Sequence, residues 1–139
     1  MIILDTNVVS EPMRPAGSPA VLDWLDHQAA STLFLTATSL SELMLGVEIL
    51  PAGRRREELR AGLAKLLDTL FEDRILAFDA PAAHAFARLV AQARSTGRVI
   101  SVADGQIAAI ATTHGFSVAT RDRAPFEAAG VPVIDPWTD

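Results

Sequence analysis

The sequence predicts an α/β domain with a central, mostly parallel sheet of five strands, and three observations lead there. Short β-branched or apolar runs alternate with longer helical patterns along the chain. Turn or cap residues bound each run, and strands joined by helices in this way usually form a parallel sheet. With 139 residues, half of them apolar, the chain can bury one substantial core. We therefore expect a single domain over residues 1–139.

The expected elements follow one another in strand and helix order. Strands are expected at 2–4, 33–37, 75–78, 117–120 and 131–134. Helices are expected at 19–28, 40–49, 54–71, 81–95 and 102–114, with a further helical turn near 125–129. Ser18, Asp79 and Ser101 precede three of these helices and suit N-caps, while Gly97 and Gly115 suit helix ends, where glycine takes a left-handed conformation.

Composition and charge exclude several classes of protein. The chain has no cysteine, so disulfides and thiolate metal sites are ruled out. The absence of disulfides is typical of proteins in the reducing cytoplasm. No apolar run approaches the roughly 18 residues that span a bilayer, so no membrane partner is expected. The net charge is −5 and Lys65 is the only lysine, which argues against an independent, strongly basic nucleic-acid-binding module. A polyanionic partner must be met locally or through a cation.

Four acidic residues stand at the ends of strands or the starts of helices. Asp5 follows the first expected strand and Asp122 the fourth, while Glu42 and Asp104 fall in the expected first turns of helices. In an open parallel sheet, ligands bind beyond the carboxyl ends of the strands, where the strand order reverses. We therefore expect these four side chains to converge at one edge.

Converging carboxylates need a cation. Like charges at close range raise one another's pKa, and burial adds to the penalty. A divalent cation removes this conflict, and with oxygen ligands alone the plausible ions are Mg²⁺ and Mn²⁺, which pair naturally with a substrate phosphate.

Three of the four acids also have a purely structural explanation. Ser39 and Glu42 have the spacing of a capping box, Asp104 can stabilise the N-terminus of its helix, and Asp122 can serve as a turn or cap residue. Asp5 is harder to explain, because an acid that closes an apolar strand offers no evident cap or turn advantage. The four acids together are therefore stronger evidence for a functional site than any one of them alone.

Other polar and aromatic residues have structural interpretations. Three histidines lack the spacing of a zinc motif and are expected at the surface or at helix ends: His27, His84 and His114. The one dense basic cluster is expected to be a solvated helix face, with contact to an RNA backbone as the alternative: Arg54 to Arg56 and Arg60. Two tryptophans are expected to anchor a core or an interface: Trp24 and Trp137.

Taken together, the motifs resemble a known family. The matching stretches run along nearly the whole chain: ILDTNVVSEPMRP, SLSELMLGVEIL, ILAFD, ADGQIAAIA, VATRD and DPWTD. In this order and at these spacings they resemble the PIN-domain ribonucleases, in particular the VapC-type toxins of bacterial toxin–antitoxin modules. Gly105 differs from the alanine common at that position in many VapC proteins and is similar to the FitB-like branch.

The resemblance implies a three-layer α/β/α fold and a Mg²⁺- or Mn²⁺-dependent endoribonuclease that hydrolyses RNA phosphodiester bonds. The family's acidic cluster falls on four positions, which are the expected catalytic residues: Asp5, Glu42, Asp104 and Asp122. Asp5, Asp104 and Asp122 would hold the metal. The neighbouring polar positions are expected to hydrogen-bond substrate or fix a carboxylate: Thr6, Asn7 and Thr120.

The resemblance also implies partners: a cognate antitoxin that neutralises the chain, operator DNA reached only through that antitoxin, and a second copy in a homodimer. An acidic pocket is a natural receptor for arginine, so we expect the antitoxin to insert a basic residue near Asp5 and Asp104. One alternative is a largely non-catalytic module that assembles with its antitoxin on operator DNA and represses transcription. A phospho-receiver domain is a weaker alternative, because it needs a lysine beside the acids and Lys65 is expected in the middle of a helix.

Overall fold

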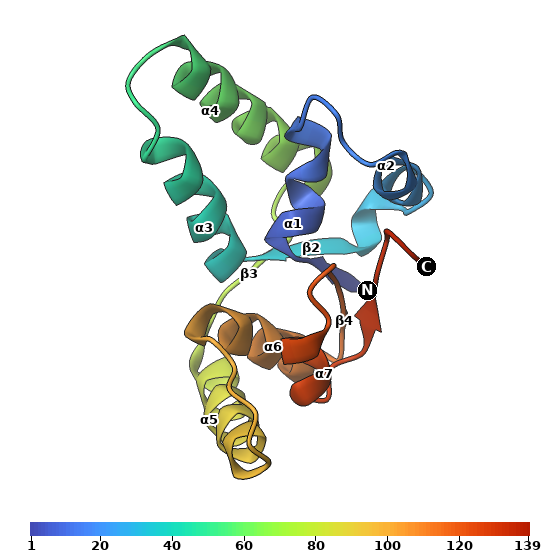
Figure 1. Ribbon diagram of the computed structural model, residues 1–139, viewed down its shortest axis with the longest axis vertical. Coiled ribbons are helices and arrows are strands. Elements are labelled where there is room, and N and C mark those ends of the chain that lie inside the picture. The colour runs from blue at the N-terminus through green and yellow to red at the C-terminus, as the bar shows by residue number, and fades with distance from the viewer.

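The centre of the fold is a five-stranded parallel sheet, as Figure 1 shows for the computed structural model, which describes residues 1–139. Its strands are β1 (Ile2–Leu4), β2 (Leu33–Thr36), β3 (Ile75–Leu76), β4 (Ser117–Ala119) and β5 (Val133–Ile134). They lie in the order β3-β2-β1-β4-β5, and every neighbouring pair is parallel. The strand order therefore reverses between β1 and β4, the place where such sheets bind ligands.

Most helices lie close to the expected ranges: α2 (Pro19–Asp26), α3 (Ala37–Glu48), α4 (Arg54–Leu66), α5 (Ala80–Ser95), α6 (Val102–His114) and α7 (Ala124–Ala128). The end of the expected helix 54–71 is a π-helical turn, η3 (Leu67–Phe71). Three short elements lie outside the expected helices: α1 (Thr6–Val9) and the 3₁₀ turns η1 (Glu11–Met13) and η2 (Ala30–Thr32). Elements of three or four residues are too short to show a helical period.

The sheet separates two apolar clusters, so the fold has three layers as expected. Because side chains alternate along a strand, Ile3 and Val118 belong to one cluster and Leu4 and Ala119 to the other. The first cluster is completed mainly by α5, α6 and α7, and the second by α1, α2 and η3. Figure 1 shows these two groups of helices on opposite sides of the sheet, with α3 and α4 extending together from one end.

Several expected helix ends are confirmed by hydrogen bonds. The Asp79 carboxylate accepts the Ala82 N–H at 3.1 Å, and the Ser101 hydroxyl accepts the Asp104 N–H at 3.1 Å. Gly97 and Gly115 have φ angles of 79° and 71°, which glycine adopts without strain. Ser18 is the N-cap residue of α2, although its side chain makes no capping hydrogen bond.

The start of α3 is a correction to the expected elements. The helix begins at Ala37 rather than residue 40, because the Thr36 hydroxyl at the end of β2 accepts the Ser39 N–H at 3.0 Å. The predicted capping box of Ser39 and Glu42 is therefore wrong. Glu42 lies in the second turn of α3 rather than the first, and its carboxylate is not used for capping.

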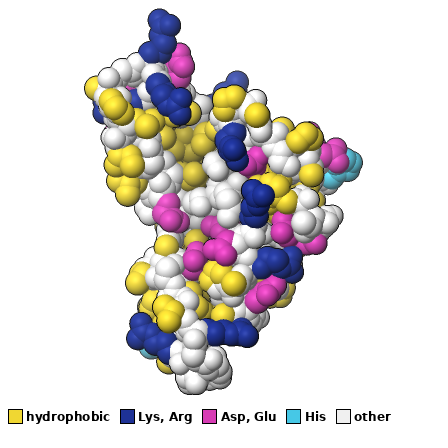
Figure 2. Space-filling view, in the orientation of Figure 1, with side chains coloured by type: hydrophobic (Ala, Val, Ile, Leu, Met, Phe, Trp, Pro, Cys, Tyr) yellow, Lys and Arg dark blue, Asp and Glu magenta, His cyan; other side chains and the backbone are white.

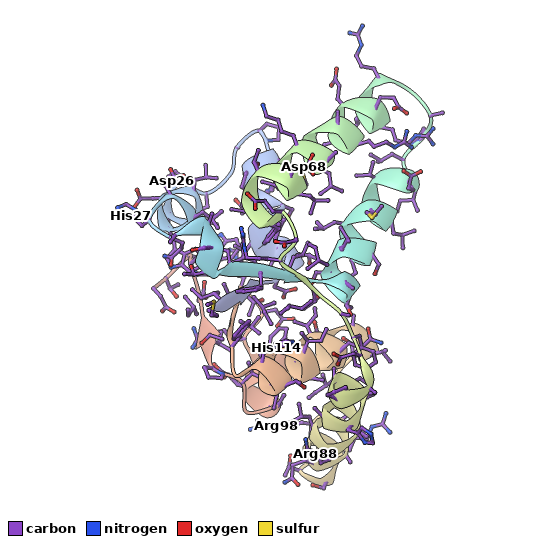
Figure 3. The ribbon with its side chains drawn as sticks, turned by 180° about the vertical axis from the view of Figure 1, so that it is seen from behind. Asp26, His27, Asp68, Arg88, Arg98 and His114 are labelled. Atoms are coloured by element: carbon purple, nitrogen blue, oxygen red, sulfur yellow. The ribbon has the colours of Figure 1, made fainter.

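The structural interpretations of the histidines and tryptophans are confirmed. Figure 3 shows His27 at the end of α2 and His114 at the end of α6, and both are exposed, as is His84. Both tryptophans are half-buried against the second apolar cluster. In the basic cluster, Arg60 forms ion pairs with Glu48 and Glu57. No helix combines the length and apolar character needed to cross a membrane.

Candidate ion-binding site

Asp5 is placed by the junction between β1 and α1. It is only 6% exposed, and its backbone, at φ −74° and ψ 161°, forms the N-cap of α1. One carboxylate oxygen, Oδ1, accepts the Thr6 N–H at 2.8 Å, and the other, Oδ2, accepts the Thr120 hydroxyl at 2.8 Å. The expectation that Asp5 brings no capping advantage is therefore wrong, since it caps a helix too short to be seen in the sequence.

Thr120 connects both halves of the site. Its hydroxyl donates to Asp5 and accepts hydrogen bonds from Asn7 Nδ2 at 3.3 Å and from the Asp122 N–H at 3.0 Å. Asn7 Oδ1 in turn accepts the Arg121 N–H at 3.3 Å. A hydroxyl has one donor and two acceptor positions, so Thr120 is saturated within the protein. The network joins the carboxyl ends of β1 and β4 on either side of the switch point.

Asp104 and Glu42 reach the same edge from two helices. Asp104 lies in the first turn of α6, which Ser101 caps, and is half-buried. The Thr38 hydroxyl donates to Gln106 Oε1 at 2.9 Å and ties the start of α3 to α6. Glu42 lies four residues after Thr38 on the same helical face, so this contact brings it toward Asp104.

The acids are close enough for their charges to contribute to raised pKa values at three of them, Asp5, Glu42 and Asp104. Burial raises the pKa of Asp5 above its ordinary value and outweighs the lowering by the hydrogen bonds from Thr120 and Thr6. The charges of Asp104 and Asp122 add smaller increases to the pKa. Burial likewise raises the pKa of Glu42, assisted by the charges of Asp5 and Asp104. The pKa of Asp104 is raised by burial and then by Asp122.

None of the four carboxylates has a basic partner. The ion pairs of the chain involve other acids, such as Glu11 with Arg14 and Glu127 with Arg123. Figure 2 shows acidic side chains gathered across the middle of this face, with basic side chains around them. Asp104 and Asp122 also line a cavity of about 710 Å³ between the start of α6 and α7.

This donor set fits a hard divalent cation in its chemistry. It consists of oxygen ligands whose mutual repulsion a cation would relieve. No group of three acidic or histidine side chains is arranged as a ready ligand set. The site is therefore not a closed cage of ligands. It is an acidic edge of the sheet, formed by Asp5, Glu42, Asp104 and Asp122, that is open to a cation.

Fold and site together define an α/β domain that concentrates acids at the switch point of a parallel sheet. The family model described as "PIN domain" matches residues 2–131, so the chain belongs to the PIN domain family.

Relatives support this membership over the full length. The chain is 47% identical to "VapC ribonuclease Y4jK" of Sinorhizobium fredii, covering 99% of this chain and 98% of that protein. It is 44% identical to "Toxin FitB" of Neisseria gonorrhoeae, with all of both chains covered. The solved structure of FitAcB from the same organism superposes with a TM-score of 0.95 at 43% identity, again over all of both chains.

Proposed function

We propose that this chain is a Mg²⁺- or Mn²⁺-dependent endoribonuclease, the toxin of a VapBC/FitAB-type toxin–antitoxin module. It acts in the cytoplasm as one domain over residues 1–139. The observation that carries the proposal is the convergence of four carboxylates, none with a basic partner, at the sheet's switch point. Relatives named as a VapC ribonuclease and as Toxin FitB, similar over nearly the whole chain, support it.

Asp5, Asp104 and Asp122 are the residues that would hold the ion. A bound divalent cation supplies a lowered water pKa and a polarised scissile phosphate. Asp5 enters this set with its carboxylate already oriented by Thr6 and Thr120. Because no three side chains form a ready ligand set, water would complete the ion's shell, as is usual for Mg²⁺.

Glu42 is the residue that would accept a proton from the attacking water. Its pKa is raised by partial burial, then by the charges of Asp5 and Asp104, and a raised pKa supports the role of a base. Thr120 is fully buried and saturated, which supports fixing the Asp5 carboxylate rather than contacting substrate. Thr6 and Asn7 are only half-buried and remain candidates for contact with the phosphate.

The proposal is tested by incubating a mixed pool of single-stranded and structured RNA with the purified, partner-free chain. We expect cutting in Mg²⁺ or Mn²⁺, none in EDTA, and none with Asp5→Asn. Asp68→Asn is the matched control, because Asp68 is an exposed acid in η3 (Figure 3) and outside the site. Failure of the folded, metal-supplied chain to cut any RNA would refute the nuclease and favour the non-catalytic assembly module.

The proposed partner is a cognate antitoxin that occupies the acidic edge, brings the chain to operator DNA, and binds a toxin homodimer. An arginine from its tail fits the unpaired carboxylates of Asp5 and Asp104, because guanidinium makes bidentate hydrogen bonds to carboxylate. Replacing that arginine with alanine should release RNA cutting in an inhibition assay. An antitoxin variant that inhibits as well as its parent would refute this mode of neutralisation.

A further inference from the structure

The acidic edge needs basic side chains nearby if it is to bind RNA, because its carboxylates and the net charge of −5 repel phosphate. Four arginines are neutralised by carboxylates within salt-bridge distance: Arg14, Arg56, Arg60 and Arg123. Among the remaining basic residues, two lie at the acidic edge, and both are exposed: Arg98 and Arg121. Neither forms a salt bridge.

Arg121 is held in place at the end of β4. Its backbone N–H donates to Asn7, and its guanidinium carbon lies 5.1 Å from the centroid of the Trp137 ring. This distance is within the range of a cation–π contact. The stack restricts the arginine without using its hydrogen-bond donors, and a planar guanidinium suits phosphate. The pKa of the buried Glu11 is lowered chiefly by a hydrogen bond from the Ser18 N–H, and the charge of Arg121 makes a small further contribution, although Arg121 and Glu11 form no salt bridge.

The DPWTD motif at the C-terminus explains why Trp137 is available for this stack. The buried Asp135 carboxylate accepts the Trp137 N–H at 2.9 Å, and the Asp135 N–H donates to the Asp139 carboxylate at 2.7 Å. These bonds close a turn directly after β5 and set the indole beside β4. The motif thus holds the ring on which Arg121 stacks.

Arg98 is placed by the end of α5. Gly97 takes a left-handed conformation, and the Arg98 N–H donates to the Ala93 carbonyl at 2.9 Å, which closes the helix. The side chain then lines the 710 Å³ cavity together with Asp104 and Asp122. Arg98 and Arg121 therefore flank the acids on different elements: Arg98 lines the cavity, and Arg121 follows Thr120 with its backbone bonded to Asn7 and its guanidinium on Trp137.

We propose that Arg121, held on Trp137 by the C-terminal turn, and Arg98 bind RNA phosphates that neighbour the cleaved one. This inference rests on the proposed ribonuclease function and assigns different ligands to different parts of the site. The acids at the centre bind the cation, and the two arginines that flank them bind the RNA backbone. Backbone contacts of this kind strengthen binding without selecting a base sequence.

The test measures RNA binding separately from cutting. Arg121→Gln, Arg98→Gln and the double variant are made in an Asp5→Asn background, which is expected not to cut. Binding of a labelled single-stranded RNA is followed by fluorescence anisotropy over a range of KCl concentrations. Arg88→Gln is the matched control, because Arg88 is an exposed arginine on α5, outside the cavity and without a salt bridge (Figure 3). Both tested arginines are exposed, and melting curves verify that each variant is folded.

We expect each substitution to weaken binding by roughly threefold to tenfold. The slope of log K against log salt should fall by about 0.7 per lost phosphate contact. Arg121→Lys, which keeps the charge, should keep the slope. In the cutting enzyme the loss should fall mainly on KM rather than kcat.

Two outcomes separate this inference from the proposed function. A double variant with the affinity and salt slope of Arg88→Gln, in a chain whose wild type cuts RNA, overturns the inference and leaves the nuclease intact. A wild type that neither binds nor cuts RNA refutes both.

Discussion

Gly105, directly after Asp104 in α6, is a position where one added methyl group must displace a neighbour. An alanine Cβ there would lie 2.7 Å from Phe86 Cε2 and 3.2 Å from Val90 Cγ2, both on α5. Gly46, in the last turn of α3, has no atom within 4 Å of the same added group. Both glycines lie within a helix and near one of its ends, so they form a pair that differs mainly in the space available to an added methyl group.

The expected magnitudes follow from these distances. Alanine is favoured over glycine inside a helix by about 1 kcal/mol, so Gly46→Ala should stabilise by about that amount. A methyl group forced into packed surroundings costs roughly 1–3 kcal/mol, so Gly105→Ala should change stability by between about 0 and −2 kcal/mol. For a chain of this length, 1 kcal/mol corresponds to roughly 3–5 °C in Tm.

The assay is thermal unfolding of both variants, of Phe86→Leu, and of Gly105→Ala combined with Phe86→Leu. Phe86 is the group that must move, and it is half-buried in an edge-to-face contact with Phe78, with ring centroids 5.9 Å apart. Shortening it should return part of the stability lost by Gly105→Ala, beyond the additive sum of the single changes. If Gly105→Ala melts as high as Gly46→Ala, the packing argument between α5 and α6 is refuted.

Two further predictions concern the acids and their support. Because the folded-state pKa of Asp5 is raised, its contribution to stability is fully present below the unfolded value and is lost as pH rises through the folded one. In EDTA, the Tm of Asp5→Asn should therefore rise relative to the Tm of wild type as the pH increases from 4 to 7. A Tm difference that stays constant over this range would contradict the raised pKa of Asp5. Thr120→Val leaves Asp5 Oδ2, Asn7 and the Asp122 N–H without their hydroxyl partner, so it should cost roughly 1–3 kcal/mol in urea unfolding and reduce RNA cutting roughly 10- to 100-fold. Unchanged unfolding and cutting would show that the network is dispensable.

The parts of the fold that the sequence predicts are those with local signals. The helix Val102–His114 matches its expected bounds because Ser101 caps its start and Gly115 ends it in a left-handed conformation. The five apolar runs also correctly predict the sheet. The first strand has its expected bounds, while the other four strands are shorter than their runs. The start of α3 is missed because a strand residue, Thr36, provides its cap.

The site is only partly predictable for a similar reason. Acids at the ends of strands are visible because parallel topology brings those ends together. The contact between Thr38 and Gln106 spans 68 residues, and no local pattern announces that it carries α3 toward α6. The sequence does not single out Arg121 within VATRD, because the position of its side chain depends on Trp137, which lies in the turn after β5.

The central claim is that this acidic edge holds the divalent cation, and calorimetric titration of Mn²⁺ into metal-free protein tests it most directly. Wild type and the Asp68→Asn control should bind the ion with the same affinity, while Asp5→Asn and Asp104→Asn should each weaken binding by at least roughly tenfold. Wild-type affinity in both site variants would place the ion elsewhere and contradict the account.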